Sequence, residues 1–562
     1  MADFETTTNA NDCRVWSWFH KSVDDLQEPV SWGKDISSFV DFIASENTII
    51  YFHNLKFDGT FLLDFMLRDG YKHVEGFPQK MGEFSTLIDR MGKFYSIRVW
   101  WWNGGKTEFR DSMKKLAFKV AEIAKAFDLH IRKGEIDYEM PRPIGYEPTQ
   151  NELEYGFNDV EIIAYALRAL FDSGATKLTA GADSLHEFKE TSGKRFFDKV
   201  FPILDPEIDT DIRTAYRGGF TYANPKFKQR MLGHGKVYDV NSLYPSVMRE
   251  HLLPYGEPEY FSGVYEYDRV YPLWIQSITF TARLKKGFIP TVQVKKTSYF
   301  IESEYQEIID DPITMSFTNV DLEILYKHYH VDIVSYNGGW KFKGLTGLFN
   351  KFIDKWMEVK INSTGAMKQI AKLHLNSLYG KFATNPTLHP KFPVLEDNRV
   401  KLKLGEESTR DPVYTAMGAF ITAYARHKTI TAAQDNIKTF AYCDTDSLHL
   451  ITTETPALDI DPDKLGAWKH EGDFNKAFYV RAKAYVEQMV TKGAKPCEPH
   501  LDVHIAGLSM EIASRVTFDD LYDGKIFKRE VLPDGTELKG KLQPVTVPGG
   551  IVLEQTSFTI KF

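Results

Sequence analysis

Two aspartates stand one residue apart in residues 440–447 (FAYCDTDS), directly after a short β-prone run. Because successive side chains of a strand alternate between its faces, this spacing predicts that Asp444 and Asp446 project in the same direction. Two carboxylates at such a short separation repel one another, and a divalent cation between them relieves the repulsion. An isolated Asp-x-Asp pair more often caps a turn, so its meaning depends on other acids in the chain.

A third aspartate has a similar setting upstream, in residues 237–245 (VYDVNSLYP). Phosphoryl transfer requires carboxylates from separate strands that converge on Mg²⁺, because the metal ions carry the charge that develops on the phosphate oxygens. The combination of Asp239 with Asp444 and Asp446 therefore predicts a metal-dependent phosphoryl-transfer centre.

Length and composition limit the class of protein. A chain of 562 residues is too long for one core and indicates several domains. No apolar run is long enough to span a bilayer and no signal peptide begins the chain, so we expect no membrane association.

Three cysteines fit neither a zinc cluster nor a disulfide framework, which indicates a reducing compartment. The net charge of −8 is unusual for a DNA-binding protein, but the lysines are clustered, so overall charge neither supports nor excludes nucleic acid.

A second set of acids occupies the N-terminal part. Asp3 and Glu5 have strand spacing, Asp58 follows an apolar strand at residues 48–52, and a capping box at residues 149–152 begins a helix that carries Asp159. Four carboxylates can thus converge on two metal ions and support hydrolysis of a phosphodiester. Tyr155, one helical turn before Asp159, would orient the attacking water. The alternatives are an exposed helix acid for Asp159 and a charged, disordered terminus for Asp3 and Glu5.

A long helix is predicted between the two C-terminal motifs. Its apolar stripe comprises Met367, Ala371, Leu375, Leu378 and Phe382. Lys368, Lys372, Asn376 and Tyr379 form a neighbouring polar face that can hold a triphosphate and stack on a base. The alternative is an ordinary amphipathic helix.

Eight motifs in a fixed order resemble the family B DNA polymerases, specifically the protein-primed phi29 type. They are residues 3–5 (DFE), 54–59 (NLKFDG), 155–159 (YGFND), 216–219 (YRGG), 239–245 (DVNSLYP), 372–380 (KLHLNSLYG), 442–447 (YCDTDS) and 483–485 (KAY). The similarity extends to residues 547–550 (VPGG), over nearly the whole chain.

The resemblance implies roles for individual residues. In the polymerase site Asp239, Asp446 and the Val240 carbonyl would bind metal, with Asp444 close by. Tyr244 would exclude a 2′-hydroxyl, Lys360 and Lys372 would hold the triphosphate, and Tyr379 would pack on the new base pair near Asn376. In the exonuclease site Asp3, Glu5, Asp58 and Asp159 would bind metal, assisted by Tyr155 and Lys133. DNA contacts would come from Thr6, Tyr51, His53, Asn54, Phe57, Ser112, Met113, Tyr138, Tyr216, Gly218, Gly219, Lys483 and Tyr485. Met113 stands where the family has leucine.

The resemblance also implies a multidomain α/β fold, with a ribonuclease H-like 3′–5′ exonuclease domain before a right-hand polymerase domain with two insertions. We expect the exonuclease at residues 1–179, the palm at 180–250 and 413–516, an insertion that handles the priming protein and DNA at 251–347, fingers at 348–384, and a thumb at 517–562. A second insertion, residues 385–412, would serve processivity and strand displacement. Within it the strict alternation of residues 400–404 and a turn at residues 396–399 predict a β-hairpin.

One departure concerns the N-terminus, because relatives carry a longer leader before the first acid. A strand that begins so close to a terminus tends to fray, so we expect a weakened exonuclease.

The resulting prediction is a protein-primed, template-directed bacteriophage DNA polymerase with strand displacement and a proofreading exonuclease, monomeric, in the host cytoplasm. It would use two Mg²⁺ per active site, replaceable by Mn²⁺, and bind primer-template DNA, deoxynucleoside triphosphates and a terminal protein. A reverse transcriptase and a non-enzymatic replication accessory protein are the alternatives.

Overall fold

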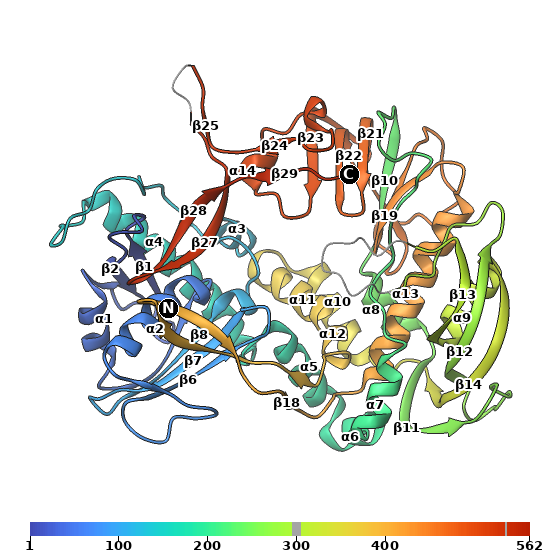
Figure 1. Cartoon of the computed structure of the whole chain (residues 1–562), viewed down its shortest axis with the longest axis horizontal. Helices are drawn as coiled ribbons and strands as arrows, with labels where there is room; N and C mark the ends of the chain where they lie inside the picture. The colour runs from blue at the N-terminus through green and yellow to red at the C-terminus, as the bar shows by residue number, and fades with distance from the viewer. Residues whose placement is uncertain (295–304, 534–536) are drawn as a thin grey trace.

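The computed structural model describes residues 1–294, 305–533 and 537–562. In Figure 1 the N-terminal unit lies on the left, residues 253–284 and 308–345 lie on the right, and the C-terminal strands cross the top. None of the helices in these described ranges is both long and apolar enough to cross a lipid bilayer.

The N-terminal unit contains a three-stranded and a five-stranded sheet. The first has the order β1-β2-β3 and the second β4-β8-β7-β6-β5, with β4 parallel to β8. The strands are β1 (Ala2–Thr6), β2 (Val15–His20), β3 (Ser31–Gly33), β4 (Asn47–Phe52), β5 (Lys72–His73), β6 (Glu83–Ile88), β7 (Phe94–Trp100) and β8 (Lys106–Asp111). The helices are α1 (Ile36–Ile43), α2 (Leu55–Arg68), α3 (Val120–Ala126) and α4 (Gln150–Asp172).

The predicted helix that carries Asp159 is confirmed as α4. Thr149 accepts a hydrogen bond from the Glu152 N–H, and the Glu152 side chain accepts one from the Thr149 N–H, which forms the expected capping box. Val160 and Leu167 are buried on its inner face.

The N-terminal strand is ordered, so the expectation that it frays is wrong. β1 pairs antiparallel with β2 along its whole length, from Ala2 opposite His20 to Thr6 opposite Val15. Met1 and Ala2 are buried, and the Phe4 ring packs edge-on against Phe39 and Phe52. The strand therefore has both backbone partners and an apolar anchor, which also excludes a disordered terminus.

A seven-stranded sheet forms the centre of the molecule. Its order is β23-β22-β21-β10-β20-β19-β9. Strand β10, which carries Asp239, therefore lies beside the β19–β20 hairpin, which carries Asp444 and Asp446. The strands are β9 (Thr221–Ala223), β10 (Gly235–Val240), β19 (Phe440–Asp444), β20 (Ser447–Leu450), β21 (Trp468–Arg481), β22 (Ala484–Lys492) and β23 (Lys495–Ile505). Helices α8 (Leu243–Glu250) and α13 (Thr415–Asp435) contribute buried residues to the adjoining core.

The predicted helix over residues 367–382 is interrupted, so the expectation of one continuous helix is wrong. The structure has α10 (Asn350–Asn362), α11 (Gly365–Ser377) and α12 (Tyr379–Phe382), with a break at Leu378. Ala371, Leu375, Leu378 and Phe382 are buried as expected, but Met367 is 42% exposed because burial on α11 begins only at Ile370.

The remaining units extend from this centre. Residues 253–284 and 308–345 form a sheet of order β11-β14-β12-β13 with a helix, namely β11 (Leu253–Phe261), β12 (Leu273–Leu284), β13 (Ile308–Thr318), α9 (Asn319–His328) and β14 (Tyr329–Leu345). The connecting elements are α5 (Ala180–Ser192), α6 (Lys194–Val200), α7 (Pro206–Arg213), β15 (Thr387–Leu388) and β18 (Ser408–Thr409). The C-terminal elements are α14 (Met510–Ala513), β24 (Ile526–Phe527), β25 (Glu530–Val531), β26 (Glu537–Leu538), β27 (Lys541–Val547), β28 (Gly550–Thr556) and β29 (Phe558–Thr559).

The predicted β-hairpin is confirmed. β16 (Lys391–Glu396) pairs antiparallel with β17 (Arg399–Leu404), and Asp397 and Asn398 form the turn with positive φ angles of 51° and 61°. Aspartate and asparagine are the residues that tolerate this left-handed backbone best after glycine.

Candidate functional site

The three C-terminal aspartates meet at one edge of the central sheet. Asp239 is the last but one residue of β10 and lies opposite Ser447, and the Val240 N–H donates to the carbonyl of Asp446 at 2.9 Å. The expectation that Asp444 and Asp446 lie on one face of a strand is wrong, because β19 ends at Asp444 and Asp446 belongs to the turn that follows. Thr445 has a φ of 61°, and the Asp446 N–H folds back onto the Asp444 carbonyl at 2.7 Å.

Asp239 and Asp446 repel each other in a partly dehydrated setting. Burial raises the pKa of Asp239 to about 7, and the charge of Asp446 adds to this rise. Burial also raises the pKa of Asp446, with a contribution from Asp444. A cation between these carboxylates would remove the repulsion, so the donor set fits a divalent metal ion.

Asp444 is held by neighbours from two other strands. Its carboxylate accepts hydrogen bonds from the Lys483 ammonium at 2.7 and 3.0 Å and from the Thr221 hydroxyl at 2.8 Å. Lys483 sits at the turn between β21 and β22 with a φ of 57°, and its N–H donates to the Tyr442 hydroxyl. Tyr485 on β22 stacks on His504 of the neighbouring strand β23 and packs against Tyr442 on β19. The two predicted primer contacts therefore lie beside Asp444.

The predicted nucleotide-binding residues face this edge. Tyr244 at the start of α8 stacks on Tyr379 at the start of α12, and Lys360 donates to the Ser242 hydroxyl at 3.0 Å. Burial lowers the pKa of Lys360, and the charges of Lys372, Lys368 and Lys469 lower it further. Four ammonium groups are therefore close enough to repel, which suits the binding of a polyphosphate. Asn376 lies exposed on α11 in the same stretch.

Two residues near Asp239 were not predicted. Lys469 and Glu471 lie on β21, and Lys469 pairs opposite Asp239 across the sheet. Their charges act on the pKa of Asp239 in opposite directions. Neither residue belongs to a recognisable motif, so only strand pairing reveals them.

The N-terminal acids converge as predicted, with Asp3 and Glu5 on β1, Asp58 in the first turn of α2 and Asp159 on α4. Glu5, Asp58 and Asp159 are buried, and Asp58 accepts a hydrogen bond from the Phe4 N–H at 3.1 Å. Burial raises the pKa of Asp3 to about 7, with Asp159 adding to it. The pKa values of Glu5 and Asp58 lie well above the usual range, mainly because both carboxyls are buried and secondly because of the charge of Asp3.

Lys133 and two tyrosines close this site. The Lys133 ammonium forms an ion pair with Asp159 and donates to the Tyr155 hydroxyl at 2.7 Å, and that hydroxyl lies 2.6 Å from the hydroxyl of Tyr138. The other carboxylate oxygen of Asp159 is buried and has no hydrogen-bond partner among the described residues. An unpaired buried carboxylate oxygen beside three further acids fits a cation site.

The described part of the chain contains no group of three or more His, Cys, Asp or Glu side chains arranged to hold a metal ion. In each site a lysine pairs with one of the carboxylates, Lys133 with Asp159 and Lys483 with Asp444. Each ammonium supplies part of the positive charge that the carboxylates require.

The other predicted DNA contacts differ in exposure. Asn54 is exposed and has a left-handed backbone conformation. The N–H groups of Asn54 and Met113 both donate to the Asp111 side chain. Asp111 was not among the residues predicted from the sequence. His53 lies 2.9 Å from the Ser112 hydroxyl. Tyr51 and Ser112 are buried and therefore support this loop, whereas Tyr138 is 48% exposed. Thr6 and Phe57 are partly exposed.

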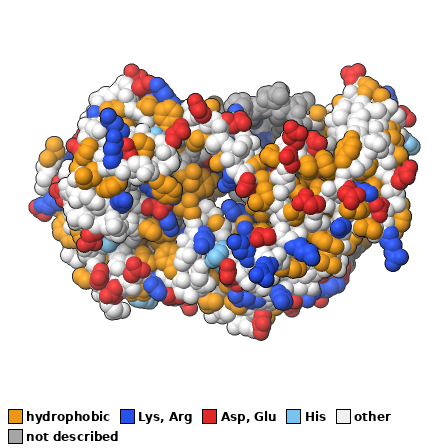
Figure 2. Space-filling model, turned by 90° about the horizontal axis from the view of Figure 1, so that it is seen from below, with side chains coloured by type: hydrophobic (Ala, Val, Ile, Leu, Met, Phe, Trp, Pro, Cys, Tyr) orange, Lys and Arg blue, Asp and Glu red, His pale blue; other side chains and the backbone are white. Residues whose placement is uncertain are grey.

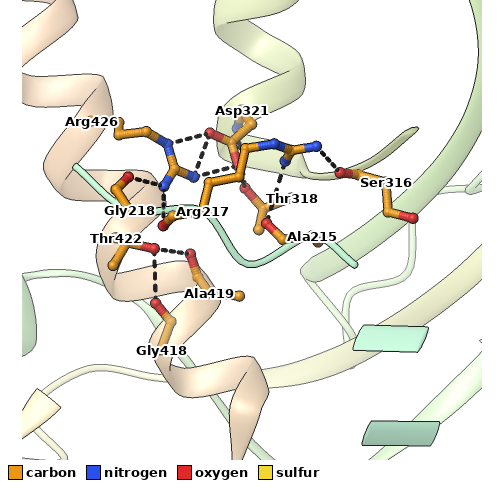
Figure 3. Close-up of polar contacts among 10 residues, drawn as sticks. All are labelled: Ala215, Arg217, Gly218, Ser316, Thr318, Asp321, Gly418, Ala419, Thr422 and Arg426. Carbon is orange, nitrogen blue, oxygen red and sulfur yellow. Dashed lines mark hydrogen bonds and ion pairs between the residues drawn. The ribbon is translucent and has the colours of Figure 1, made fainter. Parts of the chain in front are cut away.

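Figure 3 shows how the loop of residues 216–219 is anchored. Arg426 on α13 donates to the carbonyls of Arg217 and Gly218 at 2.6 and 2.8 Å and forms an ion pair with Asp321 on α9. Arg217 donates to the Ser316 carbonyl on β13. A Cβ atom on Gly219 would lie 2.5 Å from the Thr445 hydroxyl, so glycine lets the loop pass close to the aspartate turn. Tyr216 is half-buried beside it.

A basic groove lies on the underside of the molecule. Figure 2 shows Lys and Arg side chains gathered over the middle of this face. A cavity of about 340 Å³ between α5 and the base of the second insertion is lined by Lys177, His186, Lys189, Lys381 and Arg410, among others. Such a lining suits a nucleic-acid backbone.

Comparisons with known proteins show what the whole chain is similar to. Residues 41–144 and 135–465 match the family described as DNA polymerase type B, organellar and viral. The chain is 45% identical to the DNA polymerase of Bacillus phage phi29 over 579 residues, covering 100% of this chain and 98% of the relative. It is 34% identical to the DNA polymerase of Streptococcus phage Cp-1, covering 100% and 98% of the two chains.

Solved structures show the same similarity. Phi29 DNA polymerase complexed with primer-template DNA and incoming nucleotide matches with a TM-score of 0.92 and 43% identity, covering 100% of this chain and 99% of that one. An orthorhombic crystal form of that enzyme matches with a TM-score of 0.94. The predicted fold, an exonuclease domain followed by a right-hand polymerase domain, is thereby confirmed, and the accessory-protein and reverse-transcriptase alternatives are rejected.

Proposed function

Because the chain belongs to the organellar and viral type B DNA polymerases and is a DNA-directed DNA polymerase, we propose that it starts synthesis on a priming protein, displaces the non-template strand and proofreads with a separate 3′–5′ exonuclease. The single observation that carries this proposal is the 45% identity, over the whole chain, to the DNA polymerase of phage phi29. The proofreading part is also supported by two carboxylate clusters in different units, each with a lysine paired to one of its acids. Two clusters allow synthesis and degradation to run independently.

In the polymerase site Asp239, Asp446 and the Val240 carbonyl would hold Mg²⁺, with Mn²⁺ as a substitute and two ions per site. When bound, the ions supply positive charge at the reacting phosphate. Lys360 and Lys372 would bind the triphosphate, while Tyr244 and Tyr379 position the sugar and base beside Asn376. Lys483 would orient the primer end through its bond to Asp444.

In the exonuclease site Asp3, Glu5, Asp58 and Asp159 would hold the metal ions. Tyr155 would orient the attacking water, and Lys133 and Tyr138 both contact its hydroxyl and hold it in place. Burial and Asp159 raise the pKa of this phenol, so it stays protonated and can donate a hydrogen bond.

Complexes of a relative with DNA support the proposed DNA path. Phi29 DNA polymerase has been solved with primer-template DNA and with single-stranded DNA. Here the 3′ end would contact Thr6, His53, Asn54 and Phe57, and a template strand would follow the basic groove. Residues 251–347 would receive the priming protein, and the β16–β17 hairpin would enclose DNA. The domain boundaries given above, a monomeric state and a location in the host cytoplasm complete the proposal.

Primer extension on a circular single-stranded template tests this function. We expect products longer than one circle, which require displacement of the strand already made. Products that stop after one circle would contradict strand displacement. Retention of a mismatched 3′ end would contradict proofreading.

A further inference from the structure

The last turn of α2 contacts the tip of the β16–β17 hairpin. Arg68 donates to the Asp64 carboxylate at 2.6 and 3.0 Å, which orients its guanidinium. The same guanidinium donates to the Asn398 side-chain oxygen at 2.6 Å and to the Asn398 carbonyl at 2.8 Å. Arginine thus fixes the hairpin turn by a side-chain bond and a backbone bond together.

The same turn of α2 contacts a second hairpin from the C-terminal end of the chain. The Gly549 N–H, in the turn between β27 and β28, donates to Asp64 at 3.4 Å. A Cβ atom on Gly549 would lie 2.3 Å from the Cys13 carbonyl, and one on Gly550 would lie 2.3 Å from the Phe61 ring. The two glycines therefore allow this turn to reach the N-terminal unit.

Apolar side chains seal both contacts. Val400 from the first hairpin and Val547, Ile551 and Val552 from the second are buried in the core of the N-terminal unit. Figure 1 shows β27 and β28 descending from the C-terminal strands to this unit, next to the orange hairpin. Two arms that are far apart in sequence therefore end on one helix, whose first turn carries Asp58.

We propose that Asp64 and Arg68 form a clasp that closes a ring around bound DNA and so sets the length of DNA copied per binding event. The inference rests on the proposed enclosure of DNA by the β16–β17 hairpin. The arms are not covalently joined to α2, so the ring opens when the clasp and its apolar seal separate. The buried apolar side chains of the two hairpins supply contact area, whereas Asp64 and Arg68 fix the positions of the two hairpin turns on α2. Asp64 and Arg68 are positioning residues, since neither lies in the two carboxylate sites.

The test uses the full-length enzyme bound to a primed circular template, with excess unlabelled DNA added at the start to capture dissociated enzyme. We expect Arg68→Ala to shorten the products by about fivefold, because two charge-assisted hydrogen bonds to the hairpin are lost. Incorporation of a single nucleotide by prebound enzyme should stay unchanged. Asn398→Asp should lengthen the products by about twofold, since aspartate tolerates the left-handed turn and adds a charge facing Arg68.

Arg168→Ala is the matched control, because Arg168 forms the same i,i+4 pair with Asp172 on α4. Products of Arg68→Ala as long as those of the wild type would overturn the clasp while leaving the proposed function intact. If the wild-type enzyme made products of only a few nucleotides in the presence of the excess unlabelled DNA, both the clasp and the proposed function would be overturned. A Tm for Arg68→Ala equal to that of Arg168→Ala would show that the effect is not general destabilisation.

Discussion

The rings of Tyr244 and Tyr379 stack with their centroids 3.8 Å apart and their planes inclined by 20°. Tyr244 is the second residue of α8, which follows the strand of Asp239 after two residues, and Tyr379 begins α12. Burial and the neighbouring Tyr379 raise the pKa of Tyr244, so its phenol is neutral. One aromatic wall thus joins the metal-binding edge of the sheet to the helices that carry the lysines.

This wall predicts how the enzyme selects the sugar. Tyr244→Val should admit ribonucleotides, because the smaller side chain leaves room for a 2′-hydroxyl, and discrimination should fall by roughly a hundredfold. Tyr244→Phe keeps the ring and should keep the selectivity. The measurement is the ratio of kcat/KM for deoxy- and ribonucleotides, and an unchanged ratio in the valine variant would refute the role of Tyr244.

The second prediction concerns the exonuclease acids. Asp58→Ala and Asp159→Ala should each abolish degradation of a single-stranded 3′ end, by about a thousandfold or more, because each removes a metal ligand. Since β1 is a paired strand, Asp3→Ala and Glu5→Ala should have equal effects. Nucleotide release from a labelled 3′ end measures this, with nucleotide incorporation as the unaffected control. Persistent degradation by Asp58→Ala would disprove the site.

Local patterns predicted much of this fold. The capping box of α4 and the Asp397-Asn398 turn follow from interactions within a few residues, and both were confirmed. The positions of Asp444 and Asp446 could not be derived in this way, because a reversal at Thr445 replaces strand alternation. The break at Leu378 likewise has no proline to signal it, and Gly380, two residues later, lies inside α12.

Contacts between distant segments were beyond prediction. Lys469 reaches Asp239 only through the pairing of β10 with β21, and Arg68 reaches Asn398 only after both units have folded. The order of β1 was also missed, because its partner β2 and the Phe39 ring lie outside the local sequence.

The third prediction concerns the triphosphate. Lys372→Ala should raise the KM for deoxynucleotides by about tenfold or more, because a charge-assisted contact is lost from a site where several ammonium groups gather. Lys360→Ala should act similarly. Lys351→Ala, on the exposed side of α10, is the matched control. The measurement is steady-state kinetics with varied deoxynucleotide concentration. The same KM in all three variants would contradict the assignment of Lys360 and Lys372 to the triphosphate.

The fourth prediction concerns pH and stability. His374 on α11 is buried and stacks on Trp356 with a centroid distance of 4.0 Å, and burial lowers its pKa to about 4. The unfolded chain takes up a proton near the reference pKa of about 6.5, whereas the folded chain does not, so stability should fall as pH drops from 6.5 towards 4. The loss should reach at most about 3 kcal/mol. His374→Phe keeps the stacked ring without a titrating group, so its urea midpoint should fall less over this range, and an equal fall would contradict the assignment.

The central claim is that synthesis and degradation use different carboxylate clusters, and Asp446→Ala tests it most directly. One labelled primer-template is incubated with this variant in Mg²⁺, first with and then without deoxynucleotides, and the primer length is followed. We predict that extension falls by about a thousandfold or more while shortening from the 3′ end continues at the wild-type rate. Continued extension by Asp446→Ala, or loss of both activities in a variant that is folded and binds DNA, would contradict the claim.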